Sequence, residues 1–294
     1  MVRVVASYTT LPSRYEVLYM SIMTLIRQTR PPDVIYVALP KRATRLNIDY
    51  PPLPAHILEV CTVVHTDVDF GPLTKIYGAL VSETDPNTVI ISCDDDVFFD
   101  PSHIEVMLRH HEKYPNYCLC GTGALISRGM LFVSIVSSIQ PFHKWRGFTG
   151  FSVGKEGRKV DLIFGAAGVL YTRGMFPVKE RLHEELWSHA LNDSAIFHND
   201  DVLISGYLSK QGIERRVFLD IPSVQHANGP DALSGDLRKM IARMELSIER
   251  VIERGFYPQM EDVSVTETPA GRAVFALVVL FILLLVVIGF YRSL

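Results

Sequence analysis

The sequence has little cysteine, and the spacing of what it has excludes the common cysteine-based sites. A chain of 294 residues holds Cys61, Cys93, Cys118 and Cys120. Cys118 and Cys120 are too close together for a zinc ribbon, and no CxxC motif is present. We therefore expect free thiols, as in proteins of a reducing compartment.

Other absences narrow the range of functions that the protein could have. The chain has no basic excess, with a formal net charge of −3, so its charge does not favour nucleic acid as a partner. It contains neither the GxGxxG fingerprint of dinucleotide-binding folds nor the GxxxxGK[ST] sequence of a P-loop. No internal repeat stands out. Dinucleotide-dependent enzymes and P-loop enzymes are therefore not expected.

Apolar sequence is abundant enough for a sizeable core. The chain is 48% hydrophobic and 21% charged, which suits one large or two small globular domains. Strand and helix patterns alternate over roughly the first 115 residues, with strands predicted at Val2–Ser7, Val34–Leu39 and Ile57–Val64. A capping box at Ser13–Glu16 predicts the start of the first helix. This order predicts an α/β fold with a mixed, mostly parallel sheet flanked by helices.

The C-terminal region has a different composition. Ala273 to Tyr291 holds no charged residue and is bracketed by Arg272 and Arg292. As a helix it would span about 28 Å, close to the hydrocarbon thickness of a bilayer. We expect a single-pass membrane anchor at 273–291, joined to the globular domain (1–255) by a linker at 256–272. The N-terminus does not read as a signal peptide, so we expect the domain to face the cytosol.

The most informative stretch is an apolar run that ends in three aspartates. Val89 to Ser92 reads as a strand buried on both faces, and Asp94, Asp95 and Asp96 follow it. Ligands of open α/β sheets bind beyond the carboxyl ends of the strands. Crowded carboxylates there favour a divalent cation that also binds phosphate. The alternatives are a helix cap, although Ser102 with Glu105 forms a better capping box downstream, and a structural ion pair with Lys or Arg.

A second acidic motif lies about a hundred residues after the three aspartates. His198-Asn199-Asp200-Asp201-Val202 opens an apolar segment that predicts a helix. Before this motif, the segment Phe164–Tyr171 contains two glycines followed by residues that predict an apolar strand. After it, Gly235 to Arg254 has the apolar stripe of an amphipathic helix.

Together these features resemble the GT-A nucleotide-sugar glycosyltransferases, and among them the small enzymes of large DNA viruses (chlorovirus type) and some microbes. The strand with Asp94–Asp96 resembles their DxD element. Residues 1–117 resemble their nucleotide-sugar-binding half, and residues 118–255 their acceptor half, with Gly165–Leu208 carrying the likeness. The resemblance covers about residues 1–225, a span set by the matching motifs. It implies Mn²⁺ or Mg²⁺ as the cofactor. It also implies a nucleotide sugar as the donor, and among these it favours a UDP-sugar.

The resemblance also implies roles in the nucleotide half. Asp94 and Asp96 match the aspartates of DxD, as donor-side and metal ligands, with Asp95 between them. Thr9, Thr10 and Arg14 follow the first strand, where the family grips the nucleotide. An exposed helix-start cation is the alternative for Arg14.

Asp69 and Lys75 complete the predicted nucleotide contacts. They fit contacts to the base and the phosphates. The alternative is a Gly-Pro turn with a surface lysine.

In the acceptor half the resemblance implies a carboxylate base. Asp200 and Asp201 match the acidic pair of inverting members, with Asp201 at the base position and capping of the next helix as the alternative. His226 is a candidate third metal ligand or a solvated histidine. Trp145 is a candidate platform for an acceptor sugar or a core residue.

The sequence therefore predicts a membrane-anchored, metal-dependent glycosyltransferase acting on a glycan or glycoprotein hydroxyl, with inversion. A sugar-phosphate nucleotidylyltransferase is the alternative of the same fold, but the segment Thr9–Arg14 lacks the glycines of its phosphate loop. A non-catalytic, membrane-anchored carbohydrate-binding protein is the alternative of another class, and it would need neither acidic motif.

Overall fold

The structure is a computed structural model that describes residues 2–127, 130–137, 157–227, 231 and 237–257. The anchor predicted at 273–291, most of the predicted linker and Trp145 lie outside these residues. Within the described part of the chain, no helix is both long and apolar enough to cross a bilayer.

Strands and helices alternate along the N-terminal part of the chain. The elements in order are β1 (Val4–Tyr8), α1 (Tyr15–Ile26), β2 (Val34–Pro40), β3 (Arg42–Ala43), β4 (Ile48–Asp49), α2 (Ala55–Leu58), β5 (Thr62–Thr66), α3 (Thr74–Ser82), β6 (Val89–Ser92), β7 (Val97–Phe98) and α4 (His103–Lys113). The short helical turns η1 (Pro12–Arg14) and η2 (Gly71–Leu73) precede α1 and α3.

The C-terminal part is less regular. Its strands are β8 (Cys118–Cys120), β9 (Thr122–Ser127), β10 (Met130–Ser137), β11 (Arg158–Val160), β12 (Leu162–Ile163), β13 (Val169–Thr172), β14 (Arg215–Val217) and β15 (Gln225–His226). Its helices are η4 (Gly165–Ala167), η5 (Arg173–Met175), η6 (Lys179–Arg181), the π-helix η7 (His183–Trp187), α6 (Ser188–Leu191), α7 (Ser194–Phe197), α8 (Asp200–Lys210) and α9 (Leu237–Glu253).

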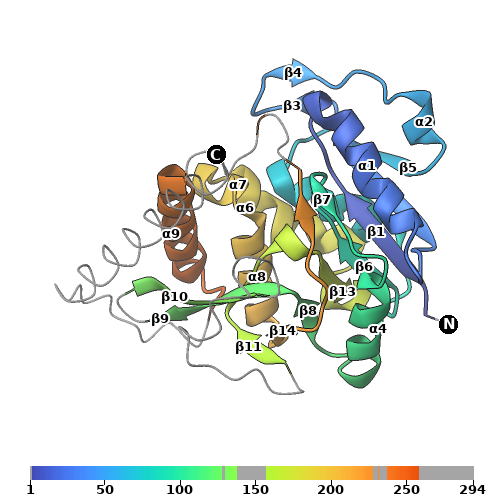
Figure 1. Ribbon diagram of the computed structural model, residues 1–294. Helices are drawn as coiled ribbons and strands as arrows, with labels where there is room; N and C mark the ends of the chain where they lie inside the picture. Colours follow the sequence, from blue (N-terminus) through green and yellow to red (C-terminus); the bar gives the residue numbers. More distant parts are fainter. Residues whose placement is uncertain (1, 128–129, 138–156, 228–230, 232–236, 258–294) are drawn as a thin grey trace, which may run out of the picture.

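One eight-stranded sheet organises the molecule, in the order β11-β14-β8-β13-β6-β1-β2-β5 (Figure 1). The run β6-β1-β2-β5 is parallel, as the alternating sequence predicts. β13 runs antiparallel between β6 and β8, and β14 returns parallel to β8. The predicted mixed, mostly parallel sheet flanked by helices is confirmed.

Helices cover both faces of this sheet, and neighbouring residues of a strand serve opposite faces. Val89 and Ile91 of β6 pack with α1 and α4, whereas Ile90 between them packs with α3 and α8. All three side chains are fully buried. Burying an aliphatic side chain of this size contributes about 1.5–3 kcal/mol, so the apolar run fixes β6 at the centre of the sheet.

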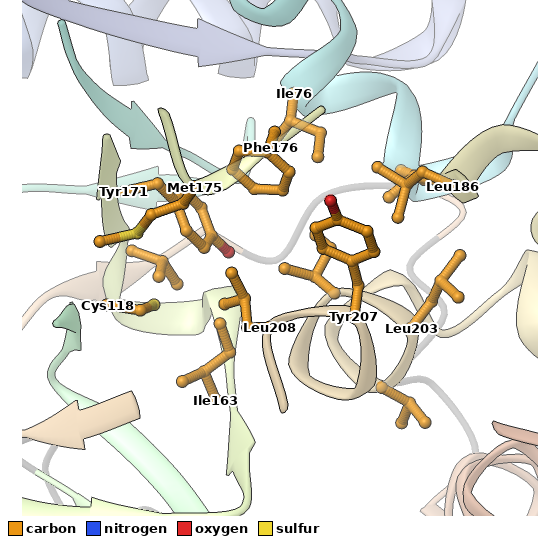
Figure 2. Packing of buried hydrophobic residues seen from close by; sticks show 14 of the residues in the cluster. Ile76, Cys118, Ile163, Tyr171, Met175, Phe176, Leu186, Leu203, Tyr207 and Leu208 are labelled. Carbon is orange, nitrogen blue, oxygen red and sulfur yellow. The ribbon is translucent and has the colours of Figure 1, made fainter. Parts of the chain in front are cut away.

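The face that carries α3 and α8 is closed by aromatic side chains (Figure 2). Phe176 and Tyr207 stack with their ring centroids 6.0 Å apart, and Tyr171 meets Phe176 edge to face at 5.3 Å. Phe176 thus links Tyr207 of α8 to Tyr171 of β13.

Some predicted elements are wrong in position. The strand predicted at Ile57–Val64 is instead the short helix α2 followed by β5. Pro54 precedes the first turn of α2, where its fixed φ suits a helix start, and Ile57 N donates to Pro54 O. Between β2 and α2 the chain forms the β3–β4 hairpin.

Neither predicted capping box forms. The helix α1 follows a 3₁₀ turn, and the Ser13 hydroxyl donates to Asp231 and accepts no helix N–H. Ser102 likewise accepts no helix N–H, and its hydroxyl donates to Asp100. In both places the serine hydroxyl contacts a carboxylate and not the N–H groups of the helix.

The globular domain also extends past the predicted boundary at 255. Phe256 and Tyr257, predicted to begin the linker, are buried, with 1% and 0% exposure. They pack against Gly206 of α8, where an added Cβ would lie 3.0 Å from Phe256 Cβ and 3.2 Å from the Tyr257 ring. The predicted amphipathic helix is confirmed as α9.

The turn before α3 packs tightly against the end of α7. Gly71 has a φ of +64°, and a Cβ there would lie 2.4 Å from the Phe197 carbonyl oxygen. Gly212 has a similar φ of +72° with nothing within 4 Å. The two glycines therefore share the left-handed backbone but differ in the space around them.

We expect Gly71→Ala to lower the free energy of unfolding more than Gly212→Ala does. Both substitutions carry a backbone cost of about 1–2 kcal/mol, and Gly71→Ala adds about 1–3 kcal/mol for the clash with Phe197. Urea unfolding of the two variants measures the difference. Equal losses in both would contradict the packing described here.

Candidate active site

A pocket of about 390 Å³ opens beyond the carboxyl ends of β1 and β6. Parallel neighbours end at one edge of a sheet, so the segments after these strands meet there. The pocket brings together every described residue predicted for the site: Thr9, Thr10, Arg14, Asp69, Lys75, Asp94, Asp95, Asp96, Asp200, Asp201 and His226.

The segment after β1 holds the aspartate run in place. Thr10 Oγ1 donates to Asp95 at 2.5 Å, and Arg14 pairs with Asp95 at 2.9 Å and also with Asp96. Thr9 Oγ1 donates to Ala38 O at the end of β2. Arg14 is therefore an internal partner of the carboxylates, with only 11% of its side chain exposed, and not a solvated cation.

The three consecutive aspartates have different environments. Asp95 is 5% exposed, and burial raises its pKa to about 6 against the opposing charge of Arg14. Burial also disfavours ionisation of Asp94, but Lys75 outweighs it and the pKa of Asp94 is lowered. Of the two aspartates that Arg14 contacts, Asp96 is the more exposed, with 22% of its side chain exposed against 6% for Asp95. Asp96 is the better placed of these two to meet a ligand.

Lys75 lies inside the protein, and the surface position considered for it from the sequence is wrong. Its side chain is 6% exposed, with Nζ 2.6 Å from Asp94 Oδ1 and 2.9 Å from Asp200 Oδ2. Burial works against its charge, but Asp200 and Asp94 raise its pKa well above the usual value. It is a buried ammonium between two carboxylates.

Asp69 has a backbone-binding role in this structure. Its Oδ1 accepts from Gly71 N at 2.7 Å, and its Oδ2 accepts from Thr44 N at 2.8 Å. It thereby joins the β3–β4 hairpin to the turn before α3, which forms one wall of the pocket. The predicted base contact stays untested.

Asp200 and Asp201 occupy the first turn of α8 without capping it. The N-cap residue is Asn199, which makes no cap bond and donates to Ala195 O and Ser247 Oγ. Asp201 Oδ2 accepts from Gly165 N at 3.0 Å. Burial and then Asp200 raise the pKa of Asp201 to about 8, while Lys75 opposes the rise. The pair thus has one lysine-bound carboxylate and one carboxyl that titrates near neutral pH.

His226 reaches the aspartates through a short ladder. β15 pairs antiparallel with β7, with His226 opposite Val97, and Ala227 N donates to Asp96 O at 2.8 Å. Aspartate oxygen and imidazole nitrogen suit Mn²⁺ and Mg²⁺ as a donor set. In the described residues, however, no three His, Cys, Asp or Glu side chains converge as a preformed metal site. Asp96 and His226 both line the pocket, so donor types that these ions use are present there.

The rim of the pocket carries basic residues that the sequence did not single out. Arg45, His198 and Arg243 line it, together with Tyr50, whose hydroxyl donates to Thr10 O at 2.7 Å. Burial lowers the pKa of His198, followed by the nearby charges of Arg243 and Arg45. His198 directly precedes the acidic pair and could have been found from the motif. Arg45 and Arg243 come from a hairpin and a polar helix face, where no local pattern marks them.

The comparison with solved structures identifies the fold. A crystal structure of GalNAc-T7 with UDP, GalNAc and Mn²⁺ is similar, with a TM-score of 0.53 and 12% sequence identity. The likeness covers 93% of this chain and 55% of that chain, so the chain spans about half the length of that protein. No family model matches the sequence, and no curated protein matches it significantly. The fold of this chain is thus similar to that of GalNAc-T7, a GT-A glycosyltransferase.

Proposed function

We propose that the chain is a metal-dependent glycosyltransferase that moves a sugar from a nucleoside diphosphate donor to a hydroxyl of a glycan or glycoprotein. The observation that carries this is the convergence of Asp94–Asp96, Asp200, Asp201 and His226 in one pocket of a glycosyltransferase fold. UDP-sugars and Mn²⁺ are the first ligands to test, because the similar structure was solved with UDP and Mn²⁺. We also propose that Asp94 and Asp96 act as the two aspartates of a DxD motif. The likeness to the small enzymes of large DNA viruses is part of the same proposal.

The donor end of the pocket lies at Asp96 and His226. A divalent cation, when bound, offsets the negative charge that develops on the diphosphate as the glycosidic bond breaks. Asp96 and His226 would hold it, with Asp94 next to them. Arg14 lies beside Asp96 and supplies further positive charge for the phosphates.

The acceptor end lies at Asp201. Its carboxylate takes the proton of the acceptor hydroxyl while that oxygen forms a bond to the anomeric carbon. The bond from the anomeric carbon to the diphosphate oxygen breaks on the opposite side, and the nucleoside diphosphate leaves with the electron pair. Displacement of this kind inverts the anomeric configuration.

The uncharged segment 273–291 is proposed as the membrane anchor of this enzyme, with the catalytic domain on the cytosolic side. The length and composition of that segment support the anchor. The described cysteines are free thiols, as expected in a reducing compartment.

We expect the protein to release sugar slowly from one member of a panel of nucleotide sugars, only when Mn²⁺ or Mg²⁺ is present. Asp96→Ala should abolish this activity and metal-assisted nucleotide binding, with an unchanged melting temperature because Asp96 is partly exposed. Activity is followed by nucleotide release, and binding by calorimetry.

Asp67→Ala is the matched control, since Asp67 is an exposed carboxylate paired with Lys41 at the end of β5. It should behave as the unmodified protein. Full activity in EDTA would contradict the metal requirement. Release of pyrophosphate from UTP and a sugar 1-phosphate would favour the nucleotidylyltransferase instead.

We expect transfer to depend on ionised Asp201, whose pKa is about 8 in the free protein. A base must be ionised, so kcat/KM for the acceptor should rise with pH and level off above about 8. The groups that face Asp201 are Asp200, Lys75, Asp94 and Gly165 N. Asp201→Asn should lose about 10²-fold or more in transfer and lose this pH dependence, yet still bind donor.

The product and the neighbouring residue decide this assignment. Unchanged turnover in Asp201→Asn together with a loss in Asp200→Asn would move the base to Asp200. A product of retained configuration, determined by NMR, would reject the base mechanism.

We expect the catalytic domain to be digested by protease added to sealed microsomes from expressing cells. A chain ending at Tyr257 should be soluble and active, since the site and the buried residues Phe256 and Tyr257 are kept. Protection of the domain in intact microsomes would show the opposite orientation.

A further inference from the structure

Lys75 joins two parts of the pocket that come from distant segments. Its ammonium lies 2.6 Å from Asp94 Oδ1, directly after β6, and 2.9 Å from Asp200 Oδ2, at the start of α8. β6 carries the donor end of the pocket and α8 carries the acidic pair. Lys75 thus forms an ion pair with each of these two segments.

The bridge is closely packed and is enclosed at its Asp200 end, while the side chain of Asp94 is 33% exposed. The side chains of Lys75 and Asp200 are 6% and 8% exposed. A Cβ added to Gly165 would lie 3.0 Å from Lys75 Nζ, 3.2 Å from Asp201 Oδ1 and 3.6 Å from Asp94 Oδ1. All three groups therefore meet over Gly165, whose backbone N–H also binds Asp201.

The attraction between Lys75 and its two carboxylates holds the three side chains in this arrangement. Removing one partner of a buried ion pair leaves an uncompensated charge, so the lysine and its carboxylates hold each other in place. Asp200 is fixed by Lys75, and Asp201 is its neighbour in the same helical turn. The position of Asp201 relative to Asp94 is therefore set through Lys75.

We propose that Lys75 is a positioning residue that fixes the acidic pair relative to the donor end of the pocket. The proposal rests on the proposed function and concerns the same site. Lys75 acts through Asp94 and Asp200, which already engage its ammonium, and not as a phosphate ligand. A misplacement of about 1 Å between reacting groups can cost about 10²-fold in rate, which is the scale expected for loss of the bridge.

The test is Lys75→Met, which keeps the length of the side chain and removes its charge. We expect kcat for transfer to fall about 10²-fold, while the Kd for UDP with Mn²⁺ changes less than tenfold. Lys41→Met is the matched control, because it removes a lysine–aspartate pair that is 76% and 78% exposed. It should leave both kcat and Kd unchanged.

A double-variant cycle tests the bridge itself. If Lys75 and Asp200 act as a unit, Lys75→Met with Asp200→Asn should lose no more kcat than the worse single variant. The double variant should also melt higher than Lys75→Met, because one uncompensated buried carboxylate is gone. If Lys75→Met does not fold, Asp200→Asn breaks the bridge on one side and should show the same split between kcat and Kd.

The outcomes separate the possibilities. A large loss of UDP affinity in Lys75→Met makes Lys75 a phosphate ligand and overturns the proposal. Unchanged kcat, or losses that multiply in the double variant, overturns it as well. An unmodified protein that neither binds UDP with Mn²⁺ nor turns over any donor overturns the proposed function, and this inference with it.

Discussion

Charge compensation at the carboxyl ends of the strands is the constraint on which the site depends. The sheet delivers Asp94, Asp95 and Asp96 to a largely enclosed place, and α8 adds two more carboxylates there. Buried carboxylates without partners would be strongly destabilising. Arg14 and Lys75 make the arrangement possible, because each contacts two of these acids. These two cations thus contact four of the acids that line the pocket.

Much of the architecture follows from local sequence, and most of the failures come from contacts between distant segments. The apolar runs at Val34 and Val89 predict central strands because burial on both faces leaves no room for polar residues. The strand predicted within Phe164–Tyr171 is present as β13, but its antiparallel place between β6 and β8 could not be predicted, because distant strands set it. β14 is three residues long, and its pairing is also set by distant strands. The capping box at Ser13 is lost to a distant contact with Asp231, whereas the one at Ser102 is lost to the nearby Asp100.

The acidic residues of the candidate site could be predicted from the sequence, but the contacts among the site residues could not. The acidic motifs mark Asp94 and Asp201 because each lies in a run of carboxylates next to an apolar segment, at the end of a predicted strand or the start of a predicted helix. Sequence alone could not show that Lys75 is enclosed between acids or that Asp69 binds backbone amides. Those outcomes depend on how α3, α8 and the β3–β4 hairpin meet, which no single segment encodes.

The order of the strands has a consequence for how the protein folds. β13 lies between β6 and β8, and β15, which carries His226, pairs with β7. Such contacts between distant segments form late, because a long loop must close before any pairing rewards it. The parallel run β6-β1-β2-β5 can assemble from the first hundred or so residues, since it needs no later strand. A nascent chain would therefore carry half a sheet with an acidic edge through most of its synthesis, and a complete pocket only once α9 has emerged.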